Sequence, residues 1–331
     1  MLVSVQELKT HFSTEAGLIK AVDGVSFDIN AGRILCLVGE SGSGKSVTGM
    51  SILRMIEPPG RIVGGRIMLD GRDLLACDDQ EMARLRGSAI SLIPQDPSSS
   101  LNPMIRIGAQ MVEAIRTHEP TISRRAARER ARDALASVGI PSPEERLDAY
   151  PFQFSGGMRQ RVVIATAFIN RPRLVIADEP TTALDVTIQG QILMEVQRMA
   201  KEHNTALLWI THDLALASEL ADDIAVMYGG QIVEKGETDT LLRQPRHHYT
   251  IGLLRSIPSM NDPGTLLPQI DGTQTWATSN QSGCRFMARC SNRQPDCENT
   301  VDETLISNNH YVRCLHPSTA AIDSLVTKRY E

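Results

Sequence analysis

The stretch that decides the fold of this chain reads Gly39-Glu40-Ser41-Gly42-Ser43-Gly44-Lys45-Ser46. It matches the phosphate-binding pattern Gly-x4-Gly-Lys-Ser/Thr at every position. An aliphatic run of strand length precedes it, and apolar residues at helical spacing follow it. Such a turn, set between a strand and a helix N-terminus, points backbone N–H groups and the positive end of the helix dipole at one place. We therefore predict a nucleoside triphosphate site, in which Lys45 binds the β- and γ-phosphates and Ser46 ligates Mg²⁺.

The composition is that of a globular protein with room for more than one domain. The chain has 331 residues, of which 41% are hydrophobic and 22% charged, and a formal net charge of −5. This acidic balance argues against nucleic acid as a partner, and the basic run at residues 124–132 has the alanine spacing of a solvated helix face. No apolar run approaches the ~20 residues of a membrane span, and the N-terminus does not resemble a signal peptide. We expect a cytoplasmic chain that meets a membrane only through a partner.

Strands and helices alternate after the phosphate stretch, as in a mostly parallel α/β sheet. Core strands are predicted at residues 89–93, 174–177 and 206–210. Gly229-Gly230, between two strand-like segments, predicts a hairpin. From about Pro245 onward, Pro, Asn, Ser and Gln become frequent and the periodicity fades. We therefore predict a separate C-terminal part.

Polar side chains follow three of the predicted strands. Asp178 is placed to hold the Mg²⁺ shell, and Glu179 to orient or deprotonate the attacking water. Gln95 would bring its amide to the metal or the water, and His212 its imidazole to the γ-phosphate. Adjacent acids also occur in surface turns, and a lone Gln or His at such a place is usually structural.

A second glycine-containing turn, at Ser155, Gly156 and Gly157, precedes another predicted helix. The helix N-terminus makes it a second anion site, with a plain Ser N-cap as the alternative. One nucleotide does not need two such sites in one chain. We therefore interpret this turn as covering the γ-phosphate of a nucleotide held by another subunit.

Together and in this order, the segments resemble the ATP-binding cassette (ABC) family of transport ATPases over about residues 1–245. Ala183-Leu184-Asp185 matches the D-loop of that family, which places Asp185 at the nucleotide. Phe12 falls where the family has an aromatic residue that stacks on adenine. The resemblance implies an α/β P-loop NTPase cassette with a RecA-like core, an antiparallel β subdomain and a helical subdomain at about residues 97–165.

The extended stretch at residues 95–103 and the sequence after Gln244 are similar to one branch of the family, the dipeptide, oligopeptide and nickel importers. Met158 and His248 depart from the usual residues of the family and of the branch. The resemblance implies a small cysteine-bearing C-terminal domain of the oligopeptide/dipeptide-transporter type at residues 246–331.

The same resemblance implies an ATPase subunit of an importer that takes up di- or oligopeptides, with nickel or another small solute as the alternative cargo. Its expected partners are a second, related ATPase chain in a heterodimer, two membrane permease subunits and an extracytoplasmic solute-binding protein. It would be peripheral, at the cytoplasmic face of the inner membrane. A soluble cassette ATPase of ribosomes or DNA, a regulatory module and an exporter subunit are the competing readings; the single cassette, Glu179 and His212 speak against them.

Four of the six cysteines cluster in the C-terminal part as Cys284-x5-Cys290-x6-Cys297-x16-Cys314. A small, loop-rich segment commonly needs a cross-link such as a disulfide or a bound metal, and disulfides are disfavoured in the cytoplasm. Four thiolates suit an iron–sulfur cluster, and related peptide importers are similar in carrying a [4Fe–4S] cluster in this tail. Zinc, with His310 or His316 as a stand-in ligand, and unliganded thiols are the alternatives. Cys36 and Cys77 are expected to take no part.

Overall fold

The computed structural model describes residues 1–331 except 16, 183–184, 263, 275–282, 308 and 321–331. The chain forms two compact units. The first unit comprises Met1–Val3, Ile29–Arg33 and Ala76–Trp209, and the second unit comprises Ser4–Asp28, Ile34–Leu75 and Ile210–Glu331. Among the described residues, none of the helices combines the length and apolar character needed to cross a membrane.

The larger sheet of the second unit has the strand order β11-β12-β10-β9-β3. Its strands are β3 (Ile34–Val38), β9 (Asp223–Tyr228), β10 (Gln231–Glu237), β11 (Thr304–Ser307) and β12 (His310–Val312). Strand β3 pairs with β9 in parallel, and β9 with β10 antiparallel. The turn between β9 and β10 is Gly229-Gly230, with φ of 54° and 84°. Two successive positive φ values suit a tight hairpin, which confirms the predicted turn.

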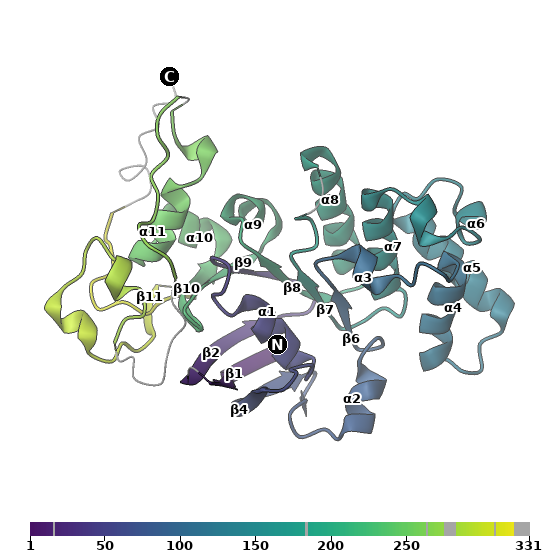
Figure 1. Ribbon diagram of the computed structural model, residues 1–331, viewed down its shortest axis with the longest axis horizontal. Helices are drawn as coiled ribbons and strands as arrows, with labels where there is room; N and C mark the ends of the chain where they lie inside the picture. The colour runs from purple at the N-terminus through teal and green to yellow at the C-terminus, as the bar shows by residue number, and fades with distance from the viewer. Residues whose placement is uncertain (16, 183–184, 263, 275–282, 308, 321–331) are drawn as a thin grey trace. The chain divides into compact units, whose positions relative to one another are not determined.

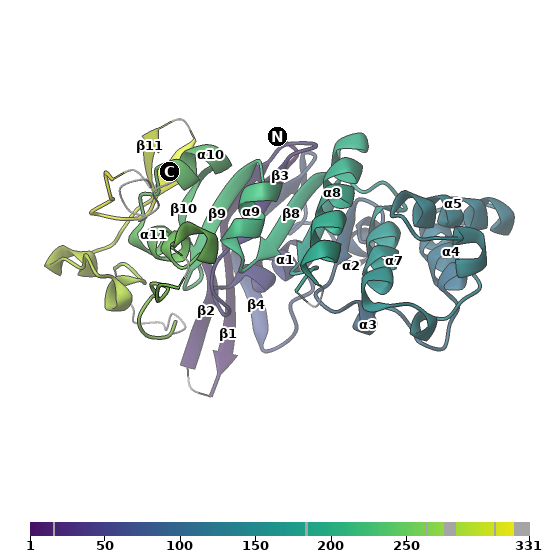
Figure 2. The same ribbon diagram turned by 90° about the horizontal axis from the view of Figure 1, so that it is seen from above.

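A four-stranded sheet with the order β2-β1-β4-β5 adds a second layer to this unit. Its strands are β1 (Val3–Thr14), β2 (Gly17–Ile29), β4 (Gly60–Leu69) and β5 (Arg72–Asp73). Figure 1 shows β1, β2 and β4 side by side below α1. The helices of the second unit are α1 (Lys45–Ile52), α9 (Leu214–Leu220), α10 (Thr238–Arg243) and α11 (His248–Arg255), with 3-10 turns η2 (Pro258–Met260), η3 (Met287–Arg289) and η4 (Pro295–Glu298). Seen from above, α9 lies over β9 (Figure 2).

The first unit holds two further strands, most of a third and most of the helices. Strand β6 (Ile90–Ile93) pairs in parallel with β7 (Leu174–Asp178), and β8 (Ala206–Thr211) lies on the other side of β7. All of β7 is buried, as expected for a central parallel strand. The helices are α2 (Asp79–Leu85), α3 (Pro97–Ser100), α4 (Ile107–His118), α5 (Arg124–Ser137), α6 (Pro143–Arg146), α7 (Gly156–Phe168) and α8 (Val186–Glu202), with the 3-10 turn η1 (Pro151–Gln153).

Residues 97–168, all of them described, contain helices and no strand. Helices α4 to α7 group together in Figure 1. Ser123 ends the connection between α4 and α5, and its Oγ accepts a hydrogen bond from the N–H of Ala126 at 3.2 Å. This stretch therefore has the helical character expected for residues 97–165.

The C-terminal part extends the sheet of the second unit. Glu234 of β10 pairs with Val312 of β12 in an antiparallel register. The compact units therefore do not separate at residue 245, since residues 210–331 fall in one of them. The division into domains at 1–245 and 246–331 stays a prediction.

Candidate functional site

The predicted phosphate loop joins the carboxyl end of β3 to the first turn of α1. Gly42 and Gly44 have φ of 83° and 105°, values that side chains disfavour. A Cβ on Gly39 would lie 2.2 Å from the carbonyl oxygen of Met227, and one on Gly44 would lie 2.1 Å from that of Ala21. Glycine is therefore needed in this loop for close approach to the neighbouring backbone as well as for its dihedral angles.

The side chains of the loop suit an anionic ligand. Lys45 is 4% exposed, and its Nζ donates to the carbonyl oxygens of Gly39 at 2.7 Å and Glu40 at 3.0 Å. The hydroxyl of Ser43 is buried and has no hydrogen-bond partner among the described residues. Ser46 is exposed in the first turn of α1. A cation folded over the loop and an unpaired buried hydroxyl are groups that phosphate oxygens would satisfy.

Phe12 and His212 lie in the same unit as the loop. Phe12, in β1, is partly exposed and its ring lies against Gly60, where a Cβ would come within 2.5 Å of Phe12 Cε1. His212 directly follows β8 and is exposed. The next residue, Asp213, caps α9 through bonds of 2.8 and 3.1 Å from the N–H groups of Ala215 and Leu216. The cap fixes the backbone on which His212 is presented.

Gln95 and Glu179 meet in the first unit. Ile93 of β6 pairs with Ala177 of β7, and Gln95 and Glu179 each lie two residues beyond their member of this pair. The Nε2 of Gln95 donates to Oε2 of Glu179 at 3.3 Å, and the hydroxyl of Thr182 donates to the same oxygen at 3.2 Å. Glu179 has φ of 45°, a strained backbone conformation for a residue with a side chain. Strain of this kind gathers at functional sites.

The remaining acidic residues of the predicted site are placed by the ends of β7 and α8. Asp178 is the last residue of β7 and is 9% exposed. Asp185 is the N-cap of α8, where its side chain accepts from the N–H of Ile188 at 3.0 Å. Ala183 and Leu184 of the predicted D-loop lie outside the described residues.

The second predicted anion site lies at the N-terminus of α7, a helix of 13 residues. The hydroxyl of Ser155 accepts from the N–H of Met158 at 3.3 Å, so Ser155 is an N-cap. A Cβ on Gly156 would meet nothing within 4 Å, whereas one on Gly157 would lie 3.0 Å from Cγ2 of Ile188. The helix N-terminus is thus capped and at the same time open to approach at Gly156.

The four cysteines of the C-terminal part line one small cavity. The cavity is lined by Cys284, Cys290, Cys297 and Cys314, together with residues that include His248, Asn292 and His316. All four are free thiols. Burial raises the pKa of Cys284 and Cys290 above the usual range, and raises that of Cys314 to about 11. The ligand atoms of Cys297, Asp296 and His316 all lie within 4.8 Å of one another.

His310, predicted as an alternative ligand, is bonded elsewhere. Its Nε2 lies 2.7 Å from Oε1 of Glu234, and both side chains are buried. The carboxylate of Glu234 also accepts from the N–H groups of Arg246 at 2.7 Å and His247 at 2.9 Å. Burial lowers the pKa of His247 to about 3, so this neighbouring imidazole is neutral. The Glu234 carboxylate therefore connects β10, β12 and the start of α11 through hydrogen bonds.

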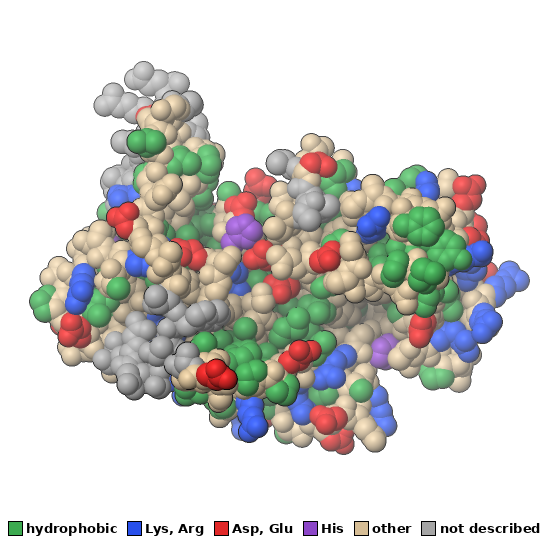
Figure 3. Space-filling model, viewed as in Figure 1, with side chains coloured by type: hydrophobic (Ala, Val, Ile, Leu, Met, Phe, Trp, Pro, Cys, Tyr) green, Lys and Arg blue, Asp and Glu red, His purple; other side chains and the backbone are tan. Residues whose placement is uncertain are grey.

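The basic run of α5 is mostly paired with acidic side chains. Arg125 pairs with Glu129 at 3.0 Å, and Arg128 with Asp148 at 2.8 Å. Figure 3 shows Lys and Arg side chains gathered over the region of α4 and α5. These pairs fit the expected solvated helix face.

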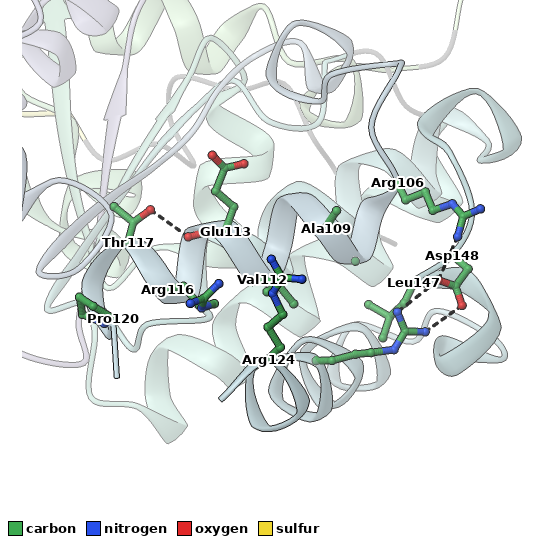
Figure 4. Close-up of a pocket in the computed structure, with 12 residues that line it drawn as sticks. Arg106, Ala109, Val112, Glu113, Arg116, Thr117, Pro120, Arg124, Leu147 and Asp148 are labelled. Atoms are coloured by element: carbon green, nitrogen blue, oxygen red, sulfur yellow. Dashed lines mark hydrogen bonds and ion pairs between the residues drawn. The ribbon is translucent and has the colours of Figure 1, made fainter. Parts of the chain in front are cut away.

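A pocket of about 690 Å³ lies beside this face, between α4 and α5. Arg106, Arg116 and Arg124 line it together with Glu113 and Asp148 (Figure 4). The pocket contains none of the residues predicted for the nucleotide site.

Two contacts of the phosphate loop could not be predicted from the sequence. The hydroxyl of Tyr249 accepts from the N–H of Glu40 at 2.9 Å, and Arg289 pairs with the Glu40 carboxylate at 2.8 Å. Both partners come from the C-terminal part, beyond residue 245. Nothing in the local pattern around the loop indicates them.

Comparisons with known proteins show the family of this chain. A family model described as ABC transporter matches residues 22–182, and one described as oligopeptide/dipeptide transporter, C-terminal region, matches residues 233–297. The chain is 46% identical to the dipeptide transport ATP-binding protein DppD of Bacillus subtilis, over 95% of this chain and 94% of that protein. It is 45% identical to the probable D,D-dipeptide transport ATP-binding protein DdpD of Escherichia coli, over 97% and 98% of the two chains.

A solved structure has the same fold. The ATP-binding cassette MJ0796, in a dimeric post-hydrolysis state bound to ADP and Pi, superposes with a TM-score of 0.64 at 24% identity, over 72% of this chain and 99% of that one. The glycine-rich loop, the strand-end carboxylates and the near full-length similarity lead to one conclusion. The chain belongs to the ABC transporter family and carries the C-terminal region of the oligopeptide and dipeptide transporters.

Proposed function

We propose that this chain is the ATP-hydrolysing subunit of an importer that takes up di- or oligopeptides. The observation that carries the proposal is the placement of Glu179 and Gln95 at the ends of paired strands, with Glu179 in a strained conformation and bonded by Gln95. The cargo rests on the C-terminal region and on relatives whose names describe dipeptide and oligopeptide transport.

The residues divide the work of phosphoryl transfer. Lys45 binds the β- and γ-phosphates, and the loop glycines let the backbone N–H groups approach them. Ser46, Asp178 and Gln95 would hold Mg²⁺, which neutralises the charge that develops on the phosphate oxygens. Glu179 orients the attacking water and accepts its proton, and His212 donates to the γ-phosphate. Phe12 stacks on adenine, and Asp185 lies at the nucleotide.

The N-terminus of α7 would act on the nucleotide of a second subunit. Ser155 is already occupied as a cap, and the open space at Gly156 suits the close approach of a ligand from outside the chain. Two related ATPase chains would then close on two ATP molecules, and ATP favours the closed state because only that state binds it on both sides. We propose a heterodimer with a related chain.

The rest of the importer comprises two membrane permease subunits and an extracytoplasmic solute-binding protein, with this chain bound peripherally at the cytoplasmic face of the inner membrane. The pocket between α4 and α5 is our candidate for the permease contact (Figure 4). It follows Gln95 closely in sequence, and Arg116 and Arg124 suit an acidic segment of a partner. Reversing both charges should abolish co-purification with the permeases, and should leave ATP binding by the isolated chain unchanged.

The C-terminal part would form a small domain from about residue 246, and a metal centre bound by its cysteines would stabilise it. The shared cavity of the four thiols supports the proposal of an iron–sulfur cluster, for which these residues would supply the ligands. The group formed by Asp296, Cys297 and His316 supports zinc as the alternative. Bound iron–sulfur or zinc would cross-link the loops of this part, which otherwise has a small apolar core.

The test is uptake in a reconstituted importer. Labelled dipeptide should enter vesicles that carry the permeases, the binding protein and both ATPase chains, and only when ATP is supplied on the ATPase side. Nickel in place of the dipeptide tests the alternative cargo. ATP-dependent nickel uptake without peptide uptake would replace the peptide reading, and absence of both would overturn the importer function.

A further inference from the structure

An arginine of the C-terminal part forms an ion pair with the phosphate loop. The Nη1 of Arg289 lies 2.8 Å from Oε2 of Glu40. Glu40 is the second residue of the loop, directly after Gly39. Both partners belong to the second unit, so the contact is internal to one compact body.

The guanidinium of Arg289 is held from its other sides by the C-terminal part. Its Nε donates to the carbonyl oxygen of Asp271 at 2.7 Å, and its Nη2 to that of Ile270 at 3.2 Å. The side chain is 8% exposed and lies over the ring of Tyr228, at 5.8 Å from the centroid. Arginine stays protonated at ordinary pH. Residues far away in sequence thus fix a positive charge beside the phosphate loop.

The backbone of Glu40 has anchors of its own. Its N–H donates to the hydroxyl of Tyr249 at 2.9 Å, and its carbonyl oxygen accepts from Nζ of Lys45 at 3.0 Å. Arg289, by contrast, is the cation that pairs with the Glu40 carboxylate in the described part of the chain. Arg289 therefore contributes to the charge of the loop, whereas the backbone conformation of the loop is held by other residues.

That charge matters because the loop must bind phosphates. The Lys45 ammonium, which binds the phosphates, lies next to the backbone of Glu40. An unpaired carboxylate on Glu40 would repel the phosphates in a partly buried site, where solvent screens charges less. Paired with Arg289, the carboxylate is neutralised.

We propose that Arg289 is the counter-ion of Glu40 and thereby sets the affinity of the phosphate loop for ATP. The C-terminal part then contributes directly to nucleotide binding, through a positioning residue that acts on the loop by way of Glu40. This inference rests on the proposed ATP-binding function and adds to it a residue that the phosphate-loop pattern does not contain.

The experiment is a double-mutant cycle on the full-length chain. Wild type, Arg289→Met, Glu40→Gln and the double variant are titrated with ATP and Mg²⁺ in a calorimeter. We expect Arg289→Met to raise the Kd for ATP roughly tenfold, through the unpaired carboxylate. Glu40→Gln should bind ATP as tightly as wild type or more tightly, and the double variant should return to within roughly threefold of wild type. A purely structural role of Arg289 does not predict this rescue.

Lys235→Met is the matched control. Lys235 ties β10 to the C-terminal part through Glu303 at 2.8 Å and does not contact the phosphate loop. The Lys235→Met variant should have a Kd for ATP within roughly twofold of the wild-type value.

Several outcomes would overturn the inference. One is an Arg289→Met variant with wild-type affinity, and another is a double variant as weak as Arg289→Met. If Arg289→Met does not fold, Glu40→Gln carries the test, because a tenfold weaker affinity in that variant contradicts charge neutralisation. A wild-type chain that fails to bind ATP overturns the proposed function as well. Wild-type binding without rescue overturns this inference alone.

Discussion

The side-chain amide of Gln95 donates a hydrogen bond of 3.3 Å to Oε2 of Glu179. The contact joins the ends of two parallel strands, where the carboxylate of Glu179 is presented on strained backbone. A water molecule that attacks the γ-phosphate needs an acceptor that is fixed in place before it arrives. Gln95 and Thr182 together hold the carboxylate in this way.

Glu179→Gln should therefore retain ATP binding and lose turnover. The amide keeps the shape of the side chain but cannot accept the proton, so we expect kcat to fall roughly 10²- to 10⁴-fold in the assembled complex. Glu202→Gln, an exposed change on α8, is the control. Near wild-type hydrolysis by Glu179→Gln would remove Glu179 from the mechanism.

Lys45→Ala should weaken ATP binding itself. It removes a cation from the phosphates and leaves the carbonyl oxygens of Gly39 and Glu40 without this donor. We expect the Kd measured by calorimetry to rise roughly tenfold to a hundredfold. Lys201→Ala, an exposed lysine of α8, should not change it. Equal affinity in the Lys45 variant and wild type would refute the phosphate-loop assignment.

Ser155→Arg should stop hydrolysis by the complex while the isolated chain still binds ATP. A long cation at the N-terminus of α7 would block closure on the partner's nucleotide. Ser155→Ala is the matched control, because it also loses the cap on Met158 but adds no bulk. That loss alone costs about 1 kcal/mol of helix stability, so a larger loss of hydrolysis in Ser155→Arg than in Ser155→Ala measures the effect of the added bulk. If Ser155→Arg abolishes ATP binding by the lone chain, the site acts on the chain's own nucleotide.

Anaerobically purified protein should be brown and contain iron and sulfide at roughly four each per chain. Cys297→Ser should lose both, because Cys297 lines the shared cavity. Cys77→Ser, a change outside that cavity, should retain them. Colourless protein with one zinc per chain would favour the zinc site, and fully folded protein without metal would contradict both readings.

Glu234→Ala should destabilise the second unit. The variant leaves the N–H groups of Arg246 and His247 and the ring of His310 without their buried acceptor. We expect a loss of roughly 3 kcal/mol in the free energy of unfolding, measured by urea denaturation. Glu237→Ala, an exposed change at the end of the same strand, should cost less than about 0.5 kcal/mol. Equal stability of the two variants would show that the hydrogen bonds of Glu234 do not stabilise the fold.

The sequence could predict what neighbouring residues determine. The phosphate loop and the Gly229-Gly230 hairpin each depend on a few consecutive residues, and the structure has both. The contact between Gln95 and Glu179 can also be understood from the sequence, because each residue follows a strand of one parallel sheet.

Long-range partners could not be predicted in this way. Arg289 lies 249 residues from Glu40, and the hydroxyl of Tyr249 lies 209 residues from the N–H that it accepts. By residue type, His310 is a candidate stand-in ligand only in the alternative of a zinc site at the cysteines. Its partner was instead decided by the pairing of β12 with β10, which brings it to a buried carboxylate.

The pairing of β12 with β10 has a consequence for solubility. Without β12, the backbone of β10 at Glu234 and Lys235 would lose its neighbouring strand, in a strand with a mostly buried sequence. Such an edge is a template for pairing with other chains, and proteins commonly cover it. The hairpin of β11 and β12 therefore acts as a cover for the cassette sheet. A chain cut after residue 245 should aggregate through this uncovered edge, even if its nucleotide-binding residues are all present.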